Sequence, residues 1–252
     1  MATLASRGRP SSRRRGETTG ELNTVLYKTL QWTAAPTIKL IWRPWIDGRE
    51  NIPETGPVIL ASNHLSVADH YFLALATRRH IATMAKIEYF TGAGLKGKLI
   101  SSTVKALGQV AVDRSGGRKS ASSLEPSLEV LEEGRVFAIF PEGTRSPDGR
   151  LYRGKPGVAR LALASGAPVI PVGLIGTEKV LPIGESRPRV APVGVRVGKP
   201  LDFTRYKGLE NDRVVIRAVT DEVMDAIRRL TGQEYVDKYA KRSAGDKDKG
   251  DD

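Results

Sequence analysis

The chain has 252 residues and no cysteine, and its 40 Lys and Arg residues against 28 Asp and Glu give a formal net charge of +12. This length is enough for one well-buried α/β domain with at most a small appendage. The lack of cysteine excludes disulfides, thiolate zinc sites and a cysteine nucleophile. With three histidines in all, we expect no metal. The positive charge leaves nucleic acid or an anionic membrane surface as candidate partners.

The N-terminal part divides into two segments. Residues 1–21 are basic, and we expect a disordered tail. Residues 22–46 place apolar side chains at helical spacing, break at Pro36, and hold Trp32, Trp42 and Trp45 among lysines and arginines. Indole rings beside basic side chains are typical of a segment at a membrane interface. The alternative is a helix that packs on the domain, with its tryptophans filling a groove.

The sequence favours peripheral attachment over a spanning helix. No apolar run of about 18 residues is present, and the N-terminal arginines are not followed by the apolar core of a signal peptide. We therefore expect the protein at the cytoplasmic face of the cell membrane, in contact with anionic lipid.

The first chemical signal is a histidine and an aspartate five positions apart, His64 and Asp69. On an ideal helix these positions lie about 140° apart and share no face. Residues 58–61 predict a buried strand and residues 66–69 a capping box, which places His64 at the carboxyl end of a strand. There an imidazole can take a proton from a hydroxyl while the carboxylate fixes its tautomer. The alternative is that Asp69 only caps the helix.

Three further apolar segments end in polar or turn residues. Residues 108–114 form a strand pattern that ends in an Asp-Arg pair, and the doubly buried strand predicted at 136–140 leads into residues 141–145. An arginine fork, a threonine hydroxyl and backbone N–H groups exposed by glycine are groups that bind phosphate. Residues 168–174 predict another strand, broken by proline. We expect all four segments to end on the same side of one sheet.

These segments resemble the glycerolipid acyltransferase family that includes 1-acylglycerol-3-phosphate acyltransferase. The four blocks of that family can be followed through residues 63–69, 108–114, 140–145 and 169–171. The resemblance implies transfer of a fatty acyl group from acyl-CoA or acyl carrier protein to a glycerolipid hydroxyl, without a bound cofactor. It also implies a place in phospholipid biosynthesis, with 1-acylglycerol-3-phosphate as the acceptor.

The resemblance assigns roles to individual residues. It makes His64 the general base and Asp69 its orienting partner. It gives the acceptor phosphate to Arg114, Glu142, Gly143, Thr144 and Arg145, with supporting motif residues Asn63, Gly108, Asp113, Pro141 and Pro171. One departure is that Gly154 and Pro156 stand where the family often has an aromatic residue and a second basic one. This keeps a different lysolipid or glycolipid acceptor open as an alternative.

The remaining sequence predicts strands that alternate with helices. We expect helices over residues 66–79, 124–133, 158–165 and 212–231, and strands at 81–86 and 193–197, the last at a sheet edge. The predicted fold is α/β, with a mostly parallel or mixed central sheet flanked by helices. The acyltransferase domain is expected at residues 47–232, followed by a charged C-terminal tail at 233–252.

Two functions from other classes were weighed. Residues 92–97 match the Gly-x-Gly-x-x-Gly dinucleotide fingerprint, but residues 87–90 separate the predicted strand from the first glycine. We therefore expect a loop over the site and not an NAD enzyme. A non-catalytic nucleic-acid-binding protein would need a basic helix or an aromatic sheet platform, whereas the predicted strands are aliphatic. The expected partners are therefore an acyl donor, a glycerolipid acceptor and a membrane, without nucleic acid.

Overall fold

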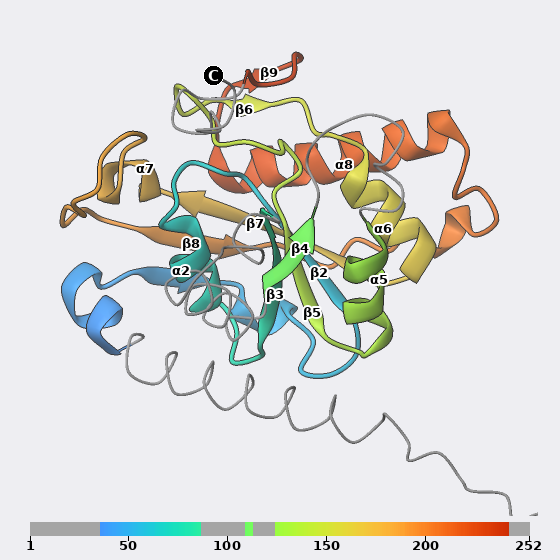
Figure 1. Ribbon diagram of the computed structural model, residues 1–252, viewed down its shortest axis with the longest axis horizontal. Coiled ribbons are helices and arrows are strands. Elements are labelled where there is room, and N and C mark those ends of the chain that lie inside the picture. The colour runs from blue at the N-terminus through green and yellow to red at the C-terminus, as the bar shows by residue number, and fades with distance from the viewer. Residues whose placement is uncertain (1–35, 87–108, 113–123, 242–252) are drawn as a thin grey trace, which may run out of the picture.

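The computed structural model describes residues 36–86, 109–112 and 124–241. A seven-stranded sheet lies between two groups of helices (Figure 1). Its strands are β1 (Trp45–Asp47), β2 (Val58–Ser62), β3 (Ile81–Lys86), β4 (Gln109–Val112), β5 (Val136–Ile139), β7 (Val169–Ile175) and β8 (Gly194–Val197). Their spatial order is β1-β8-β7-β2-β5-β3-β4. A separate two-stranded sheet pairs β6 (Leu151–Tyr152) with β9 (Tyr235–Val236).

The helices cover both faces of this sheet. They are α2 (Asp69–Ala74), α5 (Glu125–Glu132), α6 (Gly157–Ser165), α7 (Thr177–Val180) and α8 (Arg213–Thr231), with 3-10 turns η1 (Arg49–Asn51) and η4 (Thr204–Tyr206). Residues 36–42 are also helical. Helices α5, α6 and α8 pack together on one face, and α2 lies on the other (Figure 1). In the part of the chain that the structure describes, no helix is long and apolar enough to cross a bilayer.

The sheet is mixed, which confirms the predicted fold class. Strands β7, β2, β5, β3 and β4 run parallel to one another, so the four apolar segments do end on the same side. Strand β8 runs antiparallel to β7, and β1 runs parallel to β8. The prediction that residues 193–197 form an edge strand is therefore wrong. Strand β1 pairs outside β8, with Trp45 opposite Gly194.

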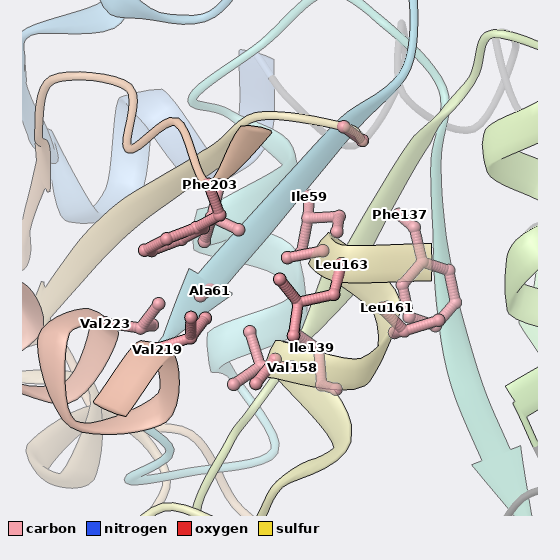
Figure 2. Close-up of a cluster of buried hydrophobic side chains, with 14 of the residues drawn as sticks. Ile59, Ala61, Phe137, Ile139, Val158, Leu161, Leu163, Phe203, Val219 and Val223 are labelled. Carbon is pink, nitrogen blue, oxygen red and sulfur yellow. The ribbon is translucent and has the colours of Figure 1, made fainter. Parts of the chain in front are cut away.

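Two buried clusters, one on each face of the sheet, explain the long apolar runs. Along β2, Ile59 and Ala61 belong to the cluster on the α6 and α8 side, while Val58 and Leu60 belong to the cluster on the α2 side. Figure 2 shows the first cluster, in which the β2 side chains lie among residues of β5, α6 and α8. A strand buried on both faces has no polar alternation, so its sequence is apolar throughout.

Helix α8 forms as the sequence predicts. The Oδ1 atom of Asp212 accepts hydrogen bonds from the backbone N–H groups of Val214 (2.7 Å) and Val215 (3.1 Å), which satisfies two unpaired donors of the first turn. Gly232 ends the helix with φ 70°, a left-handed conformation that glycine adopts without strain. The helix packs on β7, and residue 233, which follows the helix, lies at the edge of the site described below.

Two local predictions need correction. The helix expected over residues 66–79 is only α2, because residues 66–68 form a turn in which the Ser66 hydroxyl accepts from Ala68 N–H and donates to the Leu181 carbonyl. Pro171 does not interrupt β7, because it lies just before the first residue of β7 that pairs regularly with the antiparallel strand β8. Its carbonyl accepts from Gly198 N–H at 2.8 Å, and regular pairing with β8 begins at Val172.

Two short strands involve residues outside the range 47–232 in which the acyltransferase domain was expected. Residues 45–47, placed partly in the membrane segment, form β1 of the central sheet. Residues 235–236, placed in the tail, pair with β6. Both additions are short strands of two or three residues, too short to show an alternating pattern in the sequence.

Candidate functional site

The turn after β2 brings His64 and Asp69 into contact. The imidazole Nδ1 lies 2.7 Å from Asp69 Oδ2. The Asp69 side chain is fully buried, and that of His64 is 15% exposed. Asp69 is the first residue of α2, while His64 precedes the helix. The pair therefore meets across a turn and not along a helix face.

Asp69 contacts the imidazole and also holds the turn before α2, whose N-cap is Ala68 without a side-chain hydrogen bond. Its Oδ2 atom also accepts hydrogen bonds from the backbone N–H groups of Leu65 (2.7 Å) and Ser66 (2.9 Å). The same oxygen thus holds the turn before α2 and contacts the imidazole. The other oxygen, Oδ1, is buried without a hydrogen-bond partner among the described residues. Three groups, the imidazole and two backbone N–H groups, thus converge on one buried oxygen atom.

Aromatic contacts fix the plane of the imidazole. The Phe140 ring stacks on that of His64, with centroids 4.0 Å apart and an interplanar angle of 17°. The His70 ring meets both of these rings edge-on. Since Nδ1 of His64 faces Asp69, Nε2 is the nitrogen that can accept a proton from a substrate. This geometry suits a general base with a preset tautomer.

Glu142 lies beneath the site and not at its surface. The residue is 1% exposed, and its Oε1 accepts from His64 N–H at 3.1 Å while Oε2 accepts from Tyr152 N–H at 2.9 Å. Both oxygens are thus engaged by backbone donors, and a carboxylate would repel phosphate. The structure therefore gives Glu142 the support of the His64 backbone in place of the predicted contact with the acceptor. Burial raises the pKa of Glu142 to about 7, although both backbone hydrogen bonds lower it.

The turn at residues 141–146 is attached directly to the His64 turn. Ser146 N–H donates to the His64 carbonyl at 2.7 Å. Gly143 is exposed, has φ 73°, and lies so close to Lys155 that a Cβ atom there would come within 2.9 Å of the ammonium nitrogen. Thr144 is buried and Arg145 half-buried. Lys155, which no sequence motif indicated as a site residue, is held here by its backbone N–H, which donates to the Pro141 carbonyl at 2.8 Å.

Close packing explains why residue 154 is a glycine. A Cβ atom at this position would lie 2.7 Å from Met224 Cγ and 3.0 Å from Thr220 Cγ2, so α8 packs directly against the backbone here. Arg217 also donates to the Gly154 carbonyl at 3.0 Å. The glycine lets α8 approach the segment that carries Lys155, where an aromatic side chain would not fit.

Asn63 joins the ends of β2 and β7. Its Nδ2 donates to the Leu174 carbonyl at 2.9 Å, and its Oδ1 accepts from Leu174 N–H at 2.8 Å. Pro171 lies further back along β7, and Pro141 opens the turn after β5. The predicted residues Gly108, Asp113 and Arg114 lie outside the described residues, as does the glycine-rich stretch at 92–97.

The predicted membrane residues are placed differently from one another. Trp32 lies outside the described residues. Trp42 is half-buried, packs edge-on against Phe72, and donates from its indole nitrogen to the Arg189 carbonyl at 2.8 Å. Trp45 is exposed on β1, under the guanidinium of Arg196. Membrane contact by these rings remains a prediction.

The described residues do not form a cluster of metal-ligating side chains. Within residues 36–86, 109–112 and 124–241, no group of three or more His, Cys, Asp or Glu side chains could hold a metal ion. The groups that the structure brings together at this edge of the sheet are the His64 imidazole, the turn that carries Arg145, and Lys155.

A family model described as Acyltransferase matches residues 43–175, more than half of the chain. The chain belongs to this acyltransferase family. The match includes the His64 turn, the Glu142–Arg145 turn and β7. It stops before α8 and β9, which the structure packs against the same domain.

Several acyltransferases are similar to this chain. The chloroplastic 1-acyl-sn-glycerol-3-phosphate acyltransferase of Arabidopsis thaliana is 32% identical over 169 residues, which are 66% of this chain and 46% of that protein. The 1-acyl-sn-glycerol-3-phosphate acyltransferase of Borreliella burgdorferi is 30% identical over 147 residues, 58% of this chain and 54% of that one. The matched region thus spans about half the length of each relative.

A solved structure shares the fold. The crystal structure of the 1-acyl-sn-glycerophosphate acyltransferase PlsC from Thermotoga maritima matches with a TM-score of 0.56 and 24% sequence identity. The alignment covers 90% of this chain and 85% of that one, so the likeness extends beyond the region matched by the family model.

The raised pKa of Glu142 predicts a loss of stability between pH 4.5 and 7. The side chain ionises near 4.5 when the chain is unfolded and near 7 when folded, so the folded state holds its proton to higher pH. Unfolding is therefore increasingly favoured as pH rises through this window. From pH 5 to 8 the free energy of unfolding should fall by roughly 2 to 3 kcal/mol through this group alone.

Urea unfolding of the wild type and of Glu142→Gln across this range measures the effect. The variant cannot ionise at this position, so its stability should depend less on pH. Asp202→Asn is the matched control, because hydrogen bonds from Thr204 lower the pKa of Asp202 and this carboxylate does not act on Glu142. Parallel pH curves for the wild type and Glu142→Gln would contradict the prediction.

Proposed function

We propose that this chain is an O-acyltransferase that moves a fatty acyl group from a thioester donor to a hydroxyl of a glycerol phosphate or lysophospholipid. The acceptor that we favour is 1-acylglycerol-3-phosphate, for which the similar proteins from Arabidopsis thaliana and Borreliella burgdorferi are named. The observation that carries the proposal is the 2.7 Å contact of His64 with buried Asp69, next to a turn with cationic side chains. Acyl-CoA and acyl-carrier-protein are the two candidate donors, and phospholipid biosynthesis is the process served.

The reaction is a direct transfer. Nε2 of His64 takes the proton of the acceptor hydroxyl as the oxygen attacks the thioester carbonyl. The tetrahedral intermediate collapses with cleavage of the carbon–sulfur bond, and the thiolate that leaves takes the proton from the imidazolium. Asp69 stabilises the imidazolium between these two steps, since its Oδ2 atom faces Nδ1.

The acceptor phosphate binds at the turn that follows β5. Arg145 and Lys155 supply positive charge, and Gly143 leaves the backbone of the turn exposed. Ser146 N–H donates to the His64 carbonyl, so phosphate bound at this turn lies near the general base. The acceptor hydroxyl is thereby directed toward Nε2 of His64.

The protein attaches peripherally to the cytoplasmic face of the membrane through the segment that ends in β1. Two observations support this proposal. Leu40 and Ile41 are 72% and 42% exposed on the helical residues 36–42. Beside them lies an open hollow of about 480 Å³ lined by Lys39, Arg43, Pro44, Ile46 and Arg49. Exposed apolar side chains next to cations suit insertion among anionic headgroups.

The catalytic pair is tested with purified protein, labelled acyl donors and a panel of glycerol-3-phosphate, lysophosphatidate and neutral or glycosylated lysolipids. Wild-type protein should acylate lysophosphatidate. His64→Ala should lower turnover by roughly 10² to 10⁴-fold, the usual contribution of a general base. Asp69→Asn should also be impaired, because an amide can accept the backbone hydrogen bonds but cannot stabilise imidazolium.

His80→Gln serves as the matched control for these variants, since His80 precedes β3 and is no part of the site. It should retain wild-type turnover. Full activity of folded His64→Ala would exclude the mechanism, and transfer to none of the acceptors by the wild type would exclude the function.

The acceptor site is tested through Arg145→Ala and Lys155→Ala. Each should raise the KM for lysophosphatidate by about 10- to 100-fold, as expected for loss of a charge-assisted contact, and leave the KM for the donor almost unchanged. Monoacylglycerol, which has no phosphate, should show no such change. Lys199→Ala is the control, because this exposed residue follows β8 at the opposite end of the sheet. Equal changes of KM for lysophosphatidate and monoacylglycerol would mean that Arg145 and Lys155 stabilise the fold and do not bind the phosphate.

Membrane attachment is tested by sedimentation with vesicles of phosphatidylcholine, with and without phosphatidylglycerol. The double variant Leu40→Glu, Ile41→Glu should bind at least about tenfold more weakly to both, because it removes apolar side chains that insert and adds charge. Val214→Glu is the control, since Val214 is 77% exposed on α8, which lies away from residues 36–42 (Figure 1). Equal sedimentation of the double variant and the control would place the anchor elsewhere.

A further inference from the structure

The residue that follows the end of α8 reaches back to the catalytic turn. Gln233 Oε1 accepts a hydrogen bond from Asn63 Nδ2 at 3.0 Å, and its Nε2 donates to the Gly149 carbonyl at 2.6 Å. Gln233 is half-buried, and its backbone N–H donates to the Thr231 hydroxyl. The oxygen and the nitrogen of the side-chain amide are thus both hydrogen-bonded, each to a different loop.

Both partners belong to the two loops that form the site. Asn63 directly precedes His64, and Gly149 follows the turn that carries Arg145. These loops also touch through the hydrogen bond from Ser146 N–H to the His64 carbonyl. The two hydrogen bonds of Gln233 therefore form a second connection between the loop that carries His64 and the loop that carries Arg145.

A second connection from the same segment ends at His64. Residues 235–236 form β9, which pairs with β6, and Leu151 N–H donates to the Glu234 carbonyl at 2.9 Å. The next residue of β6, Tyr152, donates from its backbone to Glu142, whose other oxygen accepts from His64 N–H. The segment after α8 is thus linked to His64 through Asn63 and through Glu142.

We propose that Gln233 is a positioning residue for His64, acting through Asn63, and that it sets the distance between the general base and the bound acceptor. Residue 233 lies outside residues 43–175, where the family model matches. The inference rests on the proposed acyltransferase function for its kinetic effect. The side-chain amide accepts from Asn63 and donates to Gly149 at once, which a Glu, Leu or Asn side chain could not do, because Glu has no donor, Leu has neither group and Asn is one methylene shorter.

The kinetic test compares Gln233→Leu and Gln233→Glu with the wild type. A base moved by a fraction of an ångström should lower kcat by about 10- to 100-fold and leave the KM values of donor and acceptor within about twofold. Gln233→Glu should be the milder of the two, because it still accepts from Asn63. Glu222→Ala is the matched control: it removes a hydrogen-bonded side chain on α8, the partner of Arg205, at an exposed position. A fall in thermal stability with unchanged kcat would overturn the proposal.

A double-mutant cycle tests whether the effect passes through Asn63. If it does, the double variant Asn63→Ala, Gln233→Leu should have the kcat of the more severe single variant. Multiplicative losses of kcat would show that Gln233 acts independently of Asn63 and would overturn this part of the proposal.

Hydrogen exchange gives an answer that does not depend on turnover. In Gln233→Leu the amides of His64 and Ser146 should exchange about tenfold faster than in the wild type, while amides in α8 keep their rates. Glu222→Ala should leave both sets unchanged. If wild-type protein transfers no acyl group, the proposed function fails, and the exchange rates alone then decide whether Gln233 positions His64. Unchanged exchange at His64 and Ser146 would overturn the proposal.

Discussion

One buried oxygen atom, Oδ2 of Asp69, accepts hydrogen bonds from the His64 imidazole and from the backbone of Leu65 and Ser66. A buried polar atom is costly unless hydrogen-bond partners surround it, and here three groups converge on a single oxygen. The same oxygen thus receives the hydrogen bonds that hold the turn before α2 and the contact that orients the imidazole. Local structure at the start of a helix and the position of the His64 ring therefore depend on one atom.

A second buried carboxylate lies next to the first and has a different role. Glu142 accepts from the backbone of His64 and Tyr152, so it holds the catalytic turn from below. The charge of Asp69 contributes to raising the pKa of Glu142, and burial contributes more. The two carboxyl groups thus differ in their partners, since Asp69 faces the imidazole and two backbone donors whereas Glu142 faces backbone donors alone.

The sheet brings these groups together because its central strands are parallel. Strands β2, β5 and β7 end at the same edge, so the loops after them meet there although they are far apart in the chain. Asn63 secures the end of β2 to β7 by two hydrogen bonds with Leu174. Cores on both faces of the sheet, one of them shown in Figure 2, keep the strands in register. The site is therefore held by the most buried part of the molecule.

Features that depend on local chemistry can be predicted from the amino-acid sequence. The contact of His64 with Asp69 follows from a strand and a capping pattern within a few residues, and α8 follows from its apolar period and the caps at Asp212 and Gly232. The buried strands follow from uninterrupted apolar runs. The resemblance in four short blocks identified the family. These inferences need no knowledge of which distant segments meet.

The long-range contacts become visible only in the folded chain. The fold places Glu142 beneath His64, Lys155 against Gly143, β1 outside β8, and Gln233 on Asn63, a residue 170 positions earlier. None of these pairings leaves a periodic signal, because one hydrogen bond between two polar side chains or a strand of three residues does not alter the pattern of its own segment. Glu142 shows the consequence most clearly. Its motif indicates a surface contact with an anion, but the fold turns its carboxylate inward to two backbone donors.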